Sequence, residues 1–365
     1  MSYRTASGQP VTVGRQLATG GEGDIFEVTS PRGMVFKKYK PAILVKMPAA
    51  ERKLRAMAGS PPPQWREAGT GRVMLAWPCQ IVLENGRFVG FLMPVVDTRN
   101  TVELHRVANP SDRRNGTGAT TWLRGFTWKY LVHTAANLAH VTHVLHKSGV
   151  VVGDFNERNI LVTPHALITL IDCDSMQVKA PGGEPFFCRV GRPEFTPPEL
   201  MNADWTRTFR HPSSDLFALA IHLYQLLMDG EHPFRGVWSG NGEKPPVQQL
   251  ARQGIWAHQR GGPLRPRPAA IDFGSLPGSL QKLFRDAFEG GATSPTRRPS
   301  ALAWNQALTG LATRLQPCKA DRAHFYLADL AGCPWCRRGQ PAPAATGRPE
   351  TWAPLSRAVR RFMPL

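Results

Sequence analysis

Three polar residues in the middle of this chain have types and spacing suited to chemistry. They are Asp154, Asn159 five residues later, and Asp172, within the segments VVGDFNERNILV and IDCD. An aspartate at the first position can meet an acceptor hydroxyl. The oxygens of the other two are hard ligands, suited to magnesium that bridges nucleotide phosphates. The spacing therefore indicates phosphoryl transfer, with Asn159 and Asp172 as the magnesium ligands.

These side chains need rigid support, and two short apolar runs beside them can supply it. Residues 160–162 (ILV) follow Asn159 directly, and residues 167–171 (LITLI) precede Asp172. Runs of this length and composition predict short buried strands. A hairpin of these two strands would hold the three oxygen-bearing side chains in place.

A glycine-rich segment near the N-terminus, LATGGEGDI, is a candidate for contact with nucleotide phosphates. Gly20, Gly21 and Gly23 let the backbone turn tightly and bring N–H groups onto phosphates. Ile25 closes the segment and is included among the expected nucleotide contacts. By itself the pattern fits a plain hairpin loop equally well.

A lysine on the next strand-like run could reach the same phosphates. Lys37 in MVFKKY is the predicted residue, and Glu51 on the following helix could hold it as an ion pair. Lys38 points to the opposite face of the strand, so only one of the two lysines can serve.

The chain changes character about one third of the way along. Strand-like runs interrupted by glycine dominate at first, and helical spacing dominates later. This order predicts an α+β fold with two lobes, a strand-rich N-terminal lobe and a helical C-terminal lobe, with a ligand cleft between them. The runs are strands within 11–39 and at 73–77, 79–83 and 88–96, and helices from residues 48, 122, 215 and 280.

Composition narrows the class of protein. With 365 residues and 42% hydrophobic content, the chain can bury a sizeable core. The N-terminus lacks the order of a secretory signal and no apolar run reaches membrane-spanning length, so a cytoplasmic protein with no membrane span is expected. The net charge of +18 favours anionic partners, including nucleic acid, although the basic residues are dispersed along the chain.

Four potential zinc ligands lie close together near the C-terminus. Cys318, His324, Cys333 and Cys336 form the pattern C-x5-H-x8-C-P-W-C. Thiolates and an imidazole at this spacing can enclose zinc tetrahedrally, and four protein ligands leave no position for water. We therefore predict a structural zinc site, and a redox dithiol is the alternative interpretation.

The order of these motifs resembles the protein kinase superfamily, over residues 13 to about 312. The resemblance implies ATP with Mg²⁺ or Mn²⁺ and transfer to Ser or Thr hydroxyls of a protein substrate. It implies that Asp154 is the catalytic base and that Lys37 pairs with Glu51. It also places Met93 at the gatekeeper position and Val95 in the hinge that meets adenine.

The second half of the resemblance concerns the segments on which a peptide substrate would dock. Pro198 and Glu199 match the end of an activation segment, and Asp215 matches the buried aspartate of the helix that follows. Arg298 matches the arginine that pairs with this glutamate. Small-molecule kinases of the aminoglycoside and choline type share the aspartate–asparagine–aspartate trio but lack these docking segments.

The pattern GDxNxxNILV with IDxDS resembles a narrower group of bacterial eukaryotic-like kinases. These occur in tellurite-resistance-linked systems beside a metal-dependent phosphatase and a von Willebrand A-type protein, which the resemblance implies as partners. Some members carry helix-hairpin-helix segments that bind DNA. No convincing segment of that kind is present in this sequence, so DNA binding is not carried over.

Several positions depart from the kinase pattern. Val152 and Gly153 replace the usual His-Arg, and residues 176–195 contain no Ser, Thr or Tyr, so activation by phosphorylation of this segment is not expected. Asn156 replaces the lysine that usually steadies the transferred phosphate, and we still count it among the predicted catalytic residues. Asp174 replaces the glycine that usually follows the metal-binding aspartate, and it could help to bind metal or simply form a turn. Arg192 replaces the threonine that commonly lines the acceptor pocket of Ser/Thr kinases.

The expected organisation is a kinase N-lobe at 1–97, a C-lobe at 98–312, a Cys/His module at 313–340 and a basic, Pro/Ala-rich tail at 341–365. The predicted function is a protein kinase. A small-molecule kinase and a nucleotide-binding pseudokinase scaffold are the alternatives, and the second is weakened because Lys37, Asp154, Asn159 and Asp172 are all present.

Overall fold

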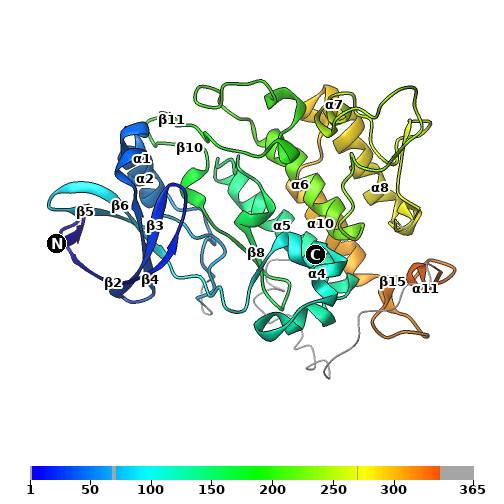
Figure 1. The fold of residues 1–365 in the computed structure, drawn as a ribbon, viewed down its shortest axis with the longest axis horizontal. Helices are drawn as coiled ribbons and strands as arrows, with labels where there is room; N and C mark the ends of the chain where they lie inside the picture. The colour runs from blue at the N-terminus through cyan, green and yellow to red at the C-terminus, as the bar shows by residue number, and fades with distance from the viewer. Residues whose placement is uncertain (1, 68–70, 269, 338–365) are drawn as a thin grey trace.

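Six strands at the N-terminal end close into a barrel (Figure 1). The computed structural model describes residues 2–67, 71–268 and 270–337. The strands pair antiparallel in the order β1-β2-β3-β4-β6-β5, and β1 also pairs with β5. Val28, Phe36, Val82 and Leu92 belong to the apolar cluster of this barrel. The strands are β1 (Tyr3–Thr5), β2 (Pro10–Thr19), β3 (Gly23–Ser30), β4 (Met34–Tyr39), β5 (Gln80–Glu84) and β6 (Arg87–Pro94).

Two helices follow β4, and the second of them packs against β5 and β6 of the barrel. They are α1 (Pro41–Lys46) and α2 (Ala50–Gly59). On α2 the buried positions are Ala50, Lys53, Leu54 and Met57, which recur every three or four residues and so form one face of the helix. The predicted helix and its apolar face are confirmed, and a lysine shares that face.

The prediction of a strand at residues 73–77 is wrong. This segment is irregular and makes only isolated bridges, of which the one between Leu75 and Leu170 is parallel. The Ala76 N–H donates to the Leu170 carbonyl at 2.9 Å, and the Leu170 N–H donates to the Met74 carbonyl at 2.9 Å. The apolar run is buried because it packs against the second half of the chain, so burial rather than strand pairing explains its composition.

The second half of the chain is mainly helical, and α6 (Pro212–Leu227) lies at its centre (Figure 1). Nearly every side chain of α6 is buried, as expected of a helix surrounded by others. It packs against α5 (Trp128–Lys147), which in turn packs against α10 (Ala301–Thr313). The remaining helices are α3 (Leu104–Ala108), α4 (Pro110–Arg114), α7 (Val247–Arg252), α8 (Gly278–Arg285) and α9 (Gly291–Thr293).

Short strand pairs lie between these helices, and two of the strands flank Asn159 and Asp172. The sheet β7-β8-β9 includes both strands predicted beside the aspartate–asparagine–aspartate trio. These strands and the other pairs are β7 (Val102–Glu103), β8 (Ile160–Val162), β9 (Ile168–Leu170), β10 (Val178–Lys179), β11 (Pro185–Phe186), β12 (Val237–Trp238) and β13 (Leu264–Arg265).

A small C-terminal unit lies at the end of the helical half, far from the barrel (Figure 1). It consists of the hairpin β14 (Leu315–Pro317) and β15 (Phe325–Leu327) followed by α11 (Pro334–Arg337). The expected mixture of helices and strands and the expected Cys/His cluster are both present. The proposed tail at 341–365 lies outside the described residues.

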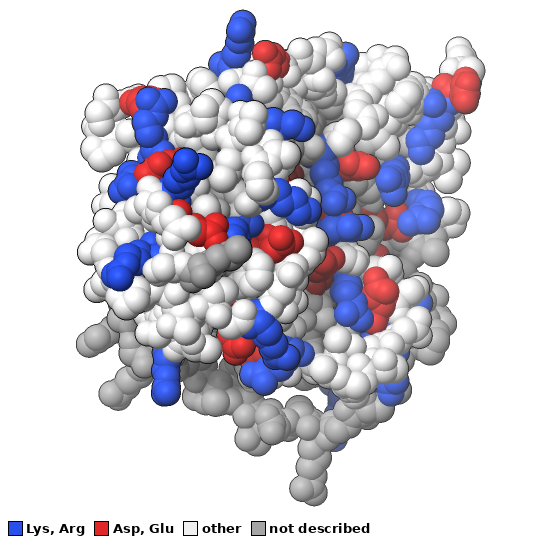
Figure 2. Space-filling model, turned by 60° about the vertical axis from the view of Figure 1, so that its left-hand side comes forward, with Lys and Arg blue, Asp and Glu red and all other residues white. Residues whose placement is uncertain are grey.

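The surface shows how the net charge of +18 is distributed. On the face drawn in Figure 2, Lys and Arg side chains are spread widely and Asp and Glu side chains lie among them. This distribution matches the dispersed basic residues of the sequence. Within the described part of the chain, no helix has both the length and the apolar character needed to cross a bilayer.

Candidate active site

Asp154 and Asn159 lie on one loop that leads into β8. The Asn159 Nδ2 amide donates to the Asp154 backbone carbonyl at 3.2 Å and to its Oδ2 at 3.3 Å. This leaves the amide oxygen of Asn159 available for a metal ion. The second carboxylate oxygen of Asp154, Oδ1, is buried and has no hydrogen-bond partner in the described part of the chain. Such an acceptor suits an incoming hydroxyl donor.

A buried aspartate on α6 fixes the backbone just before Asp154. Asp215 Oδ2 accepts the Val152 N–H at 2.7 Å, and Oδ1 accepts the Gly153 N–H at 2.9 Å. Asp215 also lies 3.0 Å from the Nε2 of His146 on α5. Two charge-assisted bonds to consecutive amides hold the loop in one conformation. The position of Asp154 therefore depends on the central helix.

Asp172 lies directly beyond β9, beside the Asn159 loop. Its backbone is left-handed, with φ 57°. The preceding Ile171 N–H donates to the Asn159 carbonyl at 3.0 Å. The structure thus brings Asp154, Asn159 and Asp172 together on adjoining segments, as the sequence predicts. Their carboxylate and amide oxygens are the donor types that magnesium prefers.

Lys37 reaches this group from the barrel and pairs with two aspartates. Its ammonium lies 2.7 Å from Asp172 Oδ1, and 2.9 and 2.7 Å from the two carboxylate oxygens of Asp174. The Tyr39 hydroxyl donates to Asp174 Oδ2 at 2.6 Å. Lys37 and Asp174 are both buried, so this is an ion pair sheltered from solvent and fully hydrogen-bonded.

Charge within this cluster shifts the pKa of each acid differently. Burial alone would raise the pKa of Asp174, but the Lys37 ammonium and the hydrogen bonds from Lys37 and Tyr39 outweigh it and lower that pKa. Burial and the neighbouring Asp174 charge raise the pKa of Asp172. Burial also opposes the charge of Lys37, yet the two aspartates raise its pKa above the ordinary value. Lys37 therefore favours the ionised form of Asp174, which accepts more of its hydrogen bonds than Asp172 does.

Glu51 does not form the expected ion pair with Lys37. Its carboxylate accepts from Arg55, one turn along α2, at 2.7 and 3.0 Å, and both side chains are partly exposed. Successive helix residues differ by about 100° in direction. Ala50 and Lys53 occupy the inward face, so Glu51 points away from the cluster.

The two candidate lysines of β4 have different environments. Lys38 donates to the Tyr3 hydroxyl at 2.9 Å and pairs with Glu84 at 3.1 Å, on the opposite side of the strand from Asp172. The alternation of side chains along a strand explains the division. Lys37 is thus the lysine that faces the aspartates.

The glycine-rich segment forms the turn between β2 and β3. The Gly20 N–H donates to the Gly23 carbonyl at 2.9 Å. A Cβ atom on Gly23 would lie 2.5 Å from the Lys38 carbonyl oxygen, so only glycine fits there, while Gly21 has open space around it. Glu22 on this turn lies 3.8 Å from Lys37, which places the turn over the charged cluster.

Ile25 and Met93 line the same barrel face as Lys37. Ile25 is directly opposite Lys37 across β3 and β4, and Met93 is opposite Val35 across β4 and β6. Opposed residues of antiparallel strands point to the same side of the sheet. Val95 follows β6, is half exposed, and donates its N–H to the Gly33 carbonyl at 3.1 Å.

Asn156 supports the loop. Its side-chain oxygen accepts the Arg158 N–H at 3.0 Å and caps the short 3₁₀ turn Glu157–Asn159. The side chain is buried. That oxygen is committed to holding the turn that carries Asn159.

A buried arginine organises the segment between Asp174 and Glu199. Arg210 donates to the Val190 carbonyl at 2.8 Å, and its guanidinium lies 4.7 Å from the centre of the Trp205 ring. A Cβ atom on Gly153 would lie 3.0 Å from Arg210 Nη1 and 2.6 Å from the Cys188 side chain. The space beside Gly153 is therefore filled by Arg210 and Cys188, which arrive from later in the chain.

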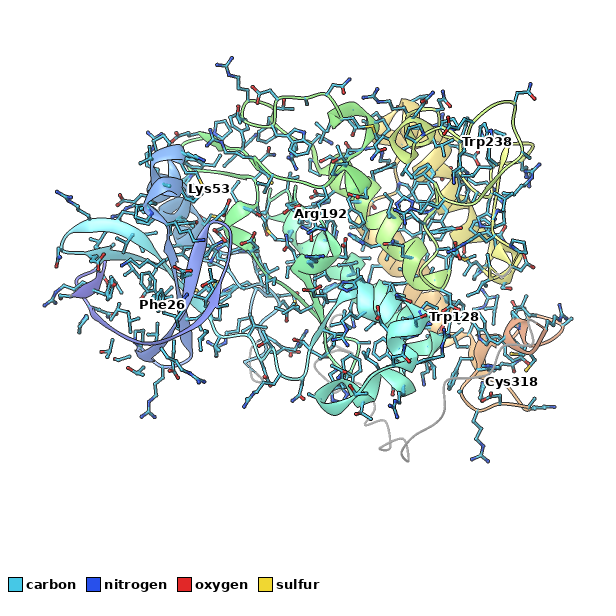
Figure 3. The ribbon with its side chains drawn as sticks, in the orientation of Figure 1. Phe26, Lys53, Trp128, Arg192, Trp238 and Cys318 are labelled. Atoms are coloured by element: carbon cyan, nitrogen blue, oxygen red, sulfur yellow. The ribbon has the colours of Figure 1, made fainter. Side chains whose placement is uncertain are left out.

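The Cys/His cluster is a second candidate site, formed by the C-terminal unit (Figure 3). One ligand atom from each of Cys318, His324, Cys333 and Cys336 lies within 4.8 Å of the others. The Cys318 and Cys336 sulfurs are 3.5 Å apart, and His324 Nδ1 lies 3.7 and 3.6 Å from the sulfurs of Cys333 and Cys336. A tetrahedral zinc with bonds of about 2.0–2.3 Å separates its ligands by about 3.5–3.8 Å. The four residues fit zinc.

This C-terminal unit is attached to the helical half by aromatic contacts. The Trp335 ring lies 5.7 Å from the Trp128 ring of α5 in an edge-to-face arrangement, and its indole N–H donates to the Phe325 carbonyl at 2.9 Å. Trp335 lies between the ligands Cys333 and Cys336. The geometry of the cluster is therefore tied to the start of α5.

Comparison with known proteins identifies relatives that match most of the chain. No family model matches it. It is 33% identical over 346 residues, 91% of its length, to the protein kinase YegI of Escherichia coli O157:H7 and, to the same extent, to that of strain K12. The chain is a relative of these protein kinases. It spans 49% of their length, so about half of each relative has no counterpart here.

Three residues of this site have contacts that the sequence alone does not predict. The sequence is compatible with Asp174 as a metal helper or as a turn former, and its motifs do not point to Lys53 or Arg210. A lysine at position 53, between Ala50 and Leu54 on a helical apolar face, is a signal that could have been noticed. Arg210 carries no such signal, because its contacts are distant in the sequence.

Proposed function

We propose that the chain is a protein kinase that transfers the γ-phosphoryl group of ATP to Ser or Thr hydroxyls of proteins. The proposal assigns residues 1–97 and 98–312 to the two lobes of a kinase fold and 313–340 to a zinc module. The observation that carries it is the 2.7 Å contact between Lys37 of the barrel and Asp172 of the helical half, beside Asn159 and Asp154. Lys37 comes from a distant part of the chain and meets a local group of three residues, which supports the roles that the family resemblance implies.

Each residue has a definite part in the proposed reaction. The glycine turn and Lys37 hold the nucleotide phosphates, and Asp154 orients the acceptor hydroxyl and receives its proton. Asn159 and Asp172 would hold magnesium, which supplies charge neutralisation at the phosphates. Asp174 and Tyr39 fix the position of Lys37 through their hydrogen bonds.

Two features favour a polypeptide over a small-molecule acceptor. Arg298 binds Glu199 through two parallel contacts of 2.6 and 2.7 Å and is buried beside α6, which anchors the end of the proposed activation segment. The second feature is that the relatives of the chain are named protein kinases, which agrees with a protein substrate.

We further propose that the activation segment needs no phosphorylation. Arg210 binds the Val190 carbonyl directly, and Gln177 exchanges two hydrogen bonds with the backbone of Arg210 at 2.6 and 2.8 Å. Phosphate-dependent ordering works through new arginine–phosphate pairs. Here an arginine is already committed to the backbone of the segment.

The Cys/His cluster is proposed as a structural zinc site. Its four ligand atoms surround one point and leave no open position for substrate. Its contact with α5 through Trp335 gives the metal a role in holding the C-terminal unit in place.

One experiment tests the enzymatic proposal. The purified chain is incubated with labelled ATP, magnesium, a generic protein substrate and a panel of small alcohols. We expect label on protein, and Asp154→Ala should reduce transfer at least about 100-fold while nucleotide binding persists. Glu243→Ala, which removes an exposed carboxylate, is the matched control.

The same reaction separates the alternatives. Label on a small alcohol would favour a small-molecule kinase, and nucleotide binding without any transfer would favour a scaffold. Mass-spectrometric mapping of the labelled chain should find no stoichiometric, activating phosphosite at residues 176–195, and such a site would overturn the proposed mode of activation.

A further inference from the structure

Lys53 is a buried lysine that has no partner among the described residues. It lies on the inward face of α2, and its residue surface is only 6% exposed. It forms no hydrogen bond or ion pair with any residue that the structure describes. Burial lowers the pKa of its ammonium group. The Nζ atom itself is not fully shielded from solvent, so the ammonium can meet an anion that enters the site.

The side chain of Lys53 lines a cavity of about 230 Å³. The walls come from α2, from Glu22 on the glycine turn, from Asp174 and from the segment 185–190. Figure 3 shows Lys53 on the side of α2 that faces the helical half. The cavity therefore lies between α2, the glycine turn and Asp174, one of the two aspartates that pair with Lys37.

The walls of the cavity connect Lys53 to the charged cluster. Glu22 belongs to the glycine turn, and Asp174 accepts hydrogen bonds from Lys37. The Asp174 and Glu22 carboxylates favour the charged form of Lys53, although burial lowers the pKa of its ammonium group. Under the proposed function, the glycine turn and the Asp172–Asp174 turn both border the nucleotide phosphates.

We infer that Lys53 binds the γ-phosphoryl group of the nucleotide and stabilises it during transfer. This inference rests on the proposed function and deepens it. The family position for a phosphate-steadying lysine holds Asn156, whose side-chain oxygen is committed to the turn at Arg158. Lys53 supplies the missing positive charge from α2.

The transfer step balances without any further reactant. The acceptor oxygen forms a bond to the γ-phosphorus, and the bond to the β–γ bridging oxygen breaks, so the electron pair leaves with ADP. Asp154 receives the hydroxyl proton. Lys53 keeps its protons and donates hydrogen bonds to a non-bridging oxygen of the transferred group, as cationic groups do in phosphoryl transfer.

Nucleotide binding provides a test that does not depend on turnover. The dissociation constants of AMP-PNP and ADP are measured with magnesium by calorimetry on the full chain. We expect the native protein to bind AMP-PNP more tightly, and Lys53→Met to reduce that preference at least about tenfold, the size expected for one charge-assisted hydrogen bond. Lys53→Arg should retain part of the preference.

The matched control is Arg55→Met, which removes a positive charge from the solvent side of the same helix and should leave the preference unchanged. Lys53→Met should unfold at an unchanged or higher temperature, because it removes an unpaired buried charge. If Lys53→Met does not fold, Lys53→Gln carries the same test.

Three results would overturn the inference. They are an unchanged preference in Lys53→Met, an equal loss of affinity for both nucleotides, and a native protein that does not prefer AMP-PNP. A Lys53-dependent preference in a chain that transfers phosphate to nothing would support the inference and reject the proposed enzymatic function. The two proposals can therefore fail separately.

Discussion

Asp174 should contribute more to stability than any surface acid, and Asp174→Asn tests this. The carboxylate is buried and accepts three hydrogen bonds, two from Lys37 at 2.9 and 2.7 Å and one from Tyr39 at 2.6 Å. Asparagine has almost the same shape but no charge, and one of its two polar ends is a donor. At least one present donor would then face the amide NH₂ group.

The expected loss follows from these contacts. Breaking a buried ion pair by removing one partner costs about 3–5 kcal/mol. Lys37 keeps its 2.7 Å contact with Asp172, so the low end of that range applies. We therefore expect Asp174→Asn to lower the free energy of unfolding by about 3 kcal/mol, which for a slope near 3 kcal/mol per molar urea moves the urea midpoint down by about 1 M.

Urea unfolding of four variants isolates the interaction. Lys37→Met alone and together with Asp174→Asn completes a double-mutant cycle, and the coupling between the two sites should be about 2 kcal/mol. Asp286→Asn is the control, because its pair with Lys282 joins neighbouring turns on the surface and contributes about 0.5 kcal/mol or less.

Two results would refute this reasoning. A midpoint for Asp174→Asn within error of the native protein would show that Lys37 is fully satisfied by Asp172. Strict additivity in the cycle would show that Lys37 and Asp174 do not interact in solution.

Two further predictions concern the metal and pH. Protein prepared without chelator should hold about one zinc per chain, and less than about a tenth of an equivalent would reject the site; Cys336→Ser should lose the metal and lower the unfolding temperature, while Cys79→Ser should not. Burial lowers the pKa of His222 to about 4 and that of His232 to about 3, so the unfolded chain binds these protons first on acidification. Stability should be full above about pH 6.5 and fall by about 2 kcal/mol per histidine between pH 6.5 and pH 5. Urea midpoints at pH 6.5 and pH 5 measure this loss, and His222→Gln should reduce it. If the midpoint of His222→Gln fell with pH as steeply as that of the native protein, His222 would not be a source of the pH dependence.

The parts of the site that sequence alone predicts are those with local contacts. Asp154, Asn159 and Asp172 are joined by one short hairpin, so their spacing already fixes their proximity. The inward face of α2 was also predictable, because Ala50, Leu54 and Met57 recur with the period of a helix.

The parts that sequence missed depend on direction or on distant segments. Glu51 is one residue from the inward face of α2, and one residue is enough to turn it toward Arg55. The apolar run at 73–77 has the composition of a strand, but its partner is Leu170, almost a hundred positions later. Arg210 meets Val190 and Gln177 only after the segment between them has folded back.

The change of partner for Lys37 alters how α2 can affect the site. A glutamate on α2 would tie the lysine to the helix, so that any rotation of the helix would move the lysine. Asp174 is instead two residues from Asp172, so Lys37, its partner and the proposed metal ligand belong to one hydrogen-bonded unit. From this face of α2, Lys53 acts on that unit only through its charge. We therefore expect a displacement of α2 to leave the Lys37–Asp174 contacts intact and to change the electrostatic field over Asp174 and Glu22. Under the proposed function, the helix would then act on the transferred group rather than on Lys37, the lysine proposed to hold the nucleotide.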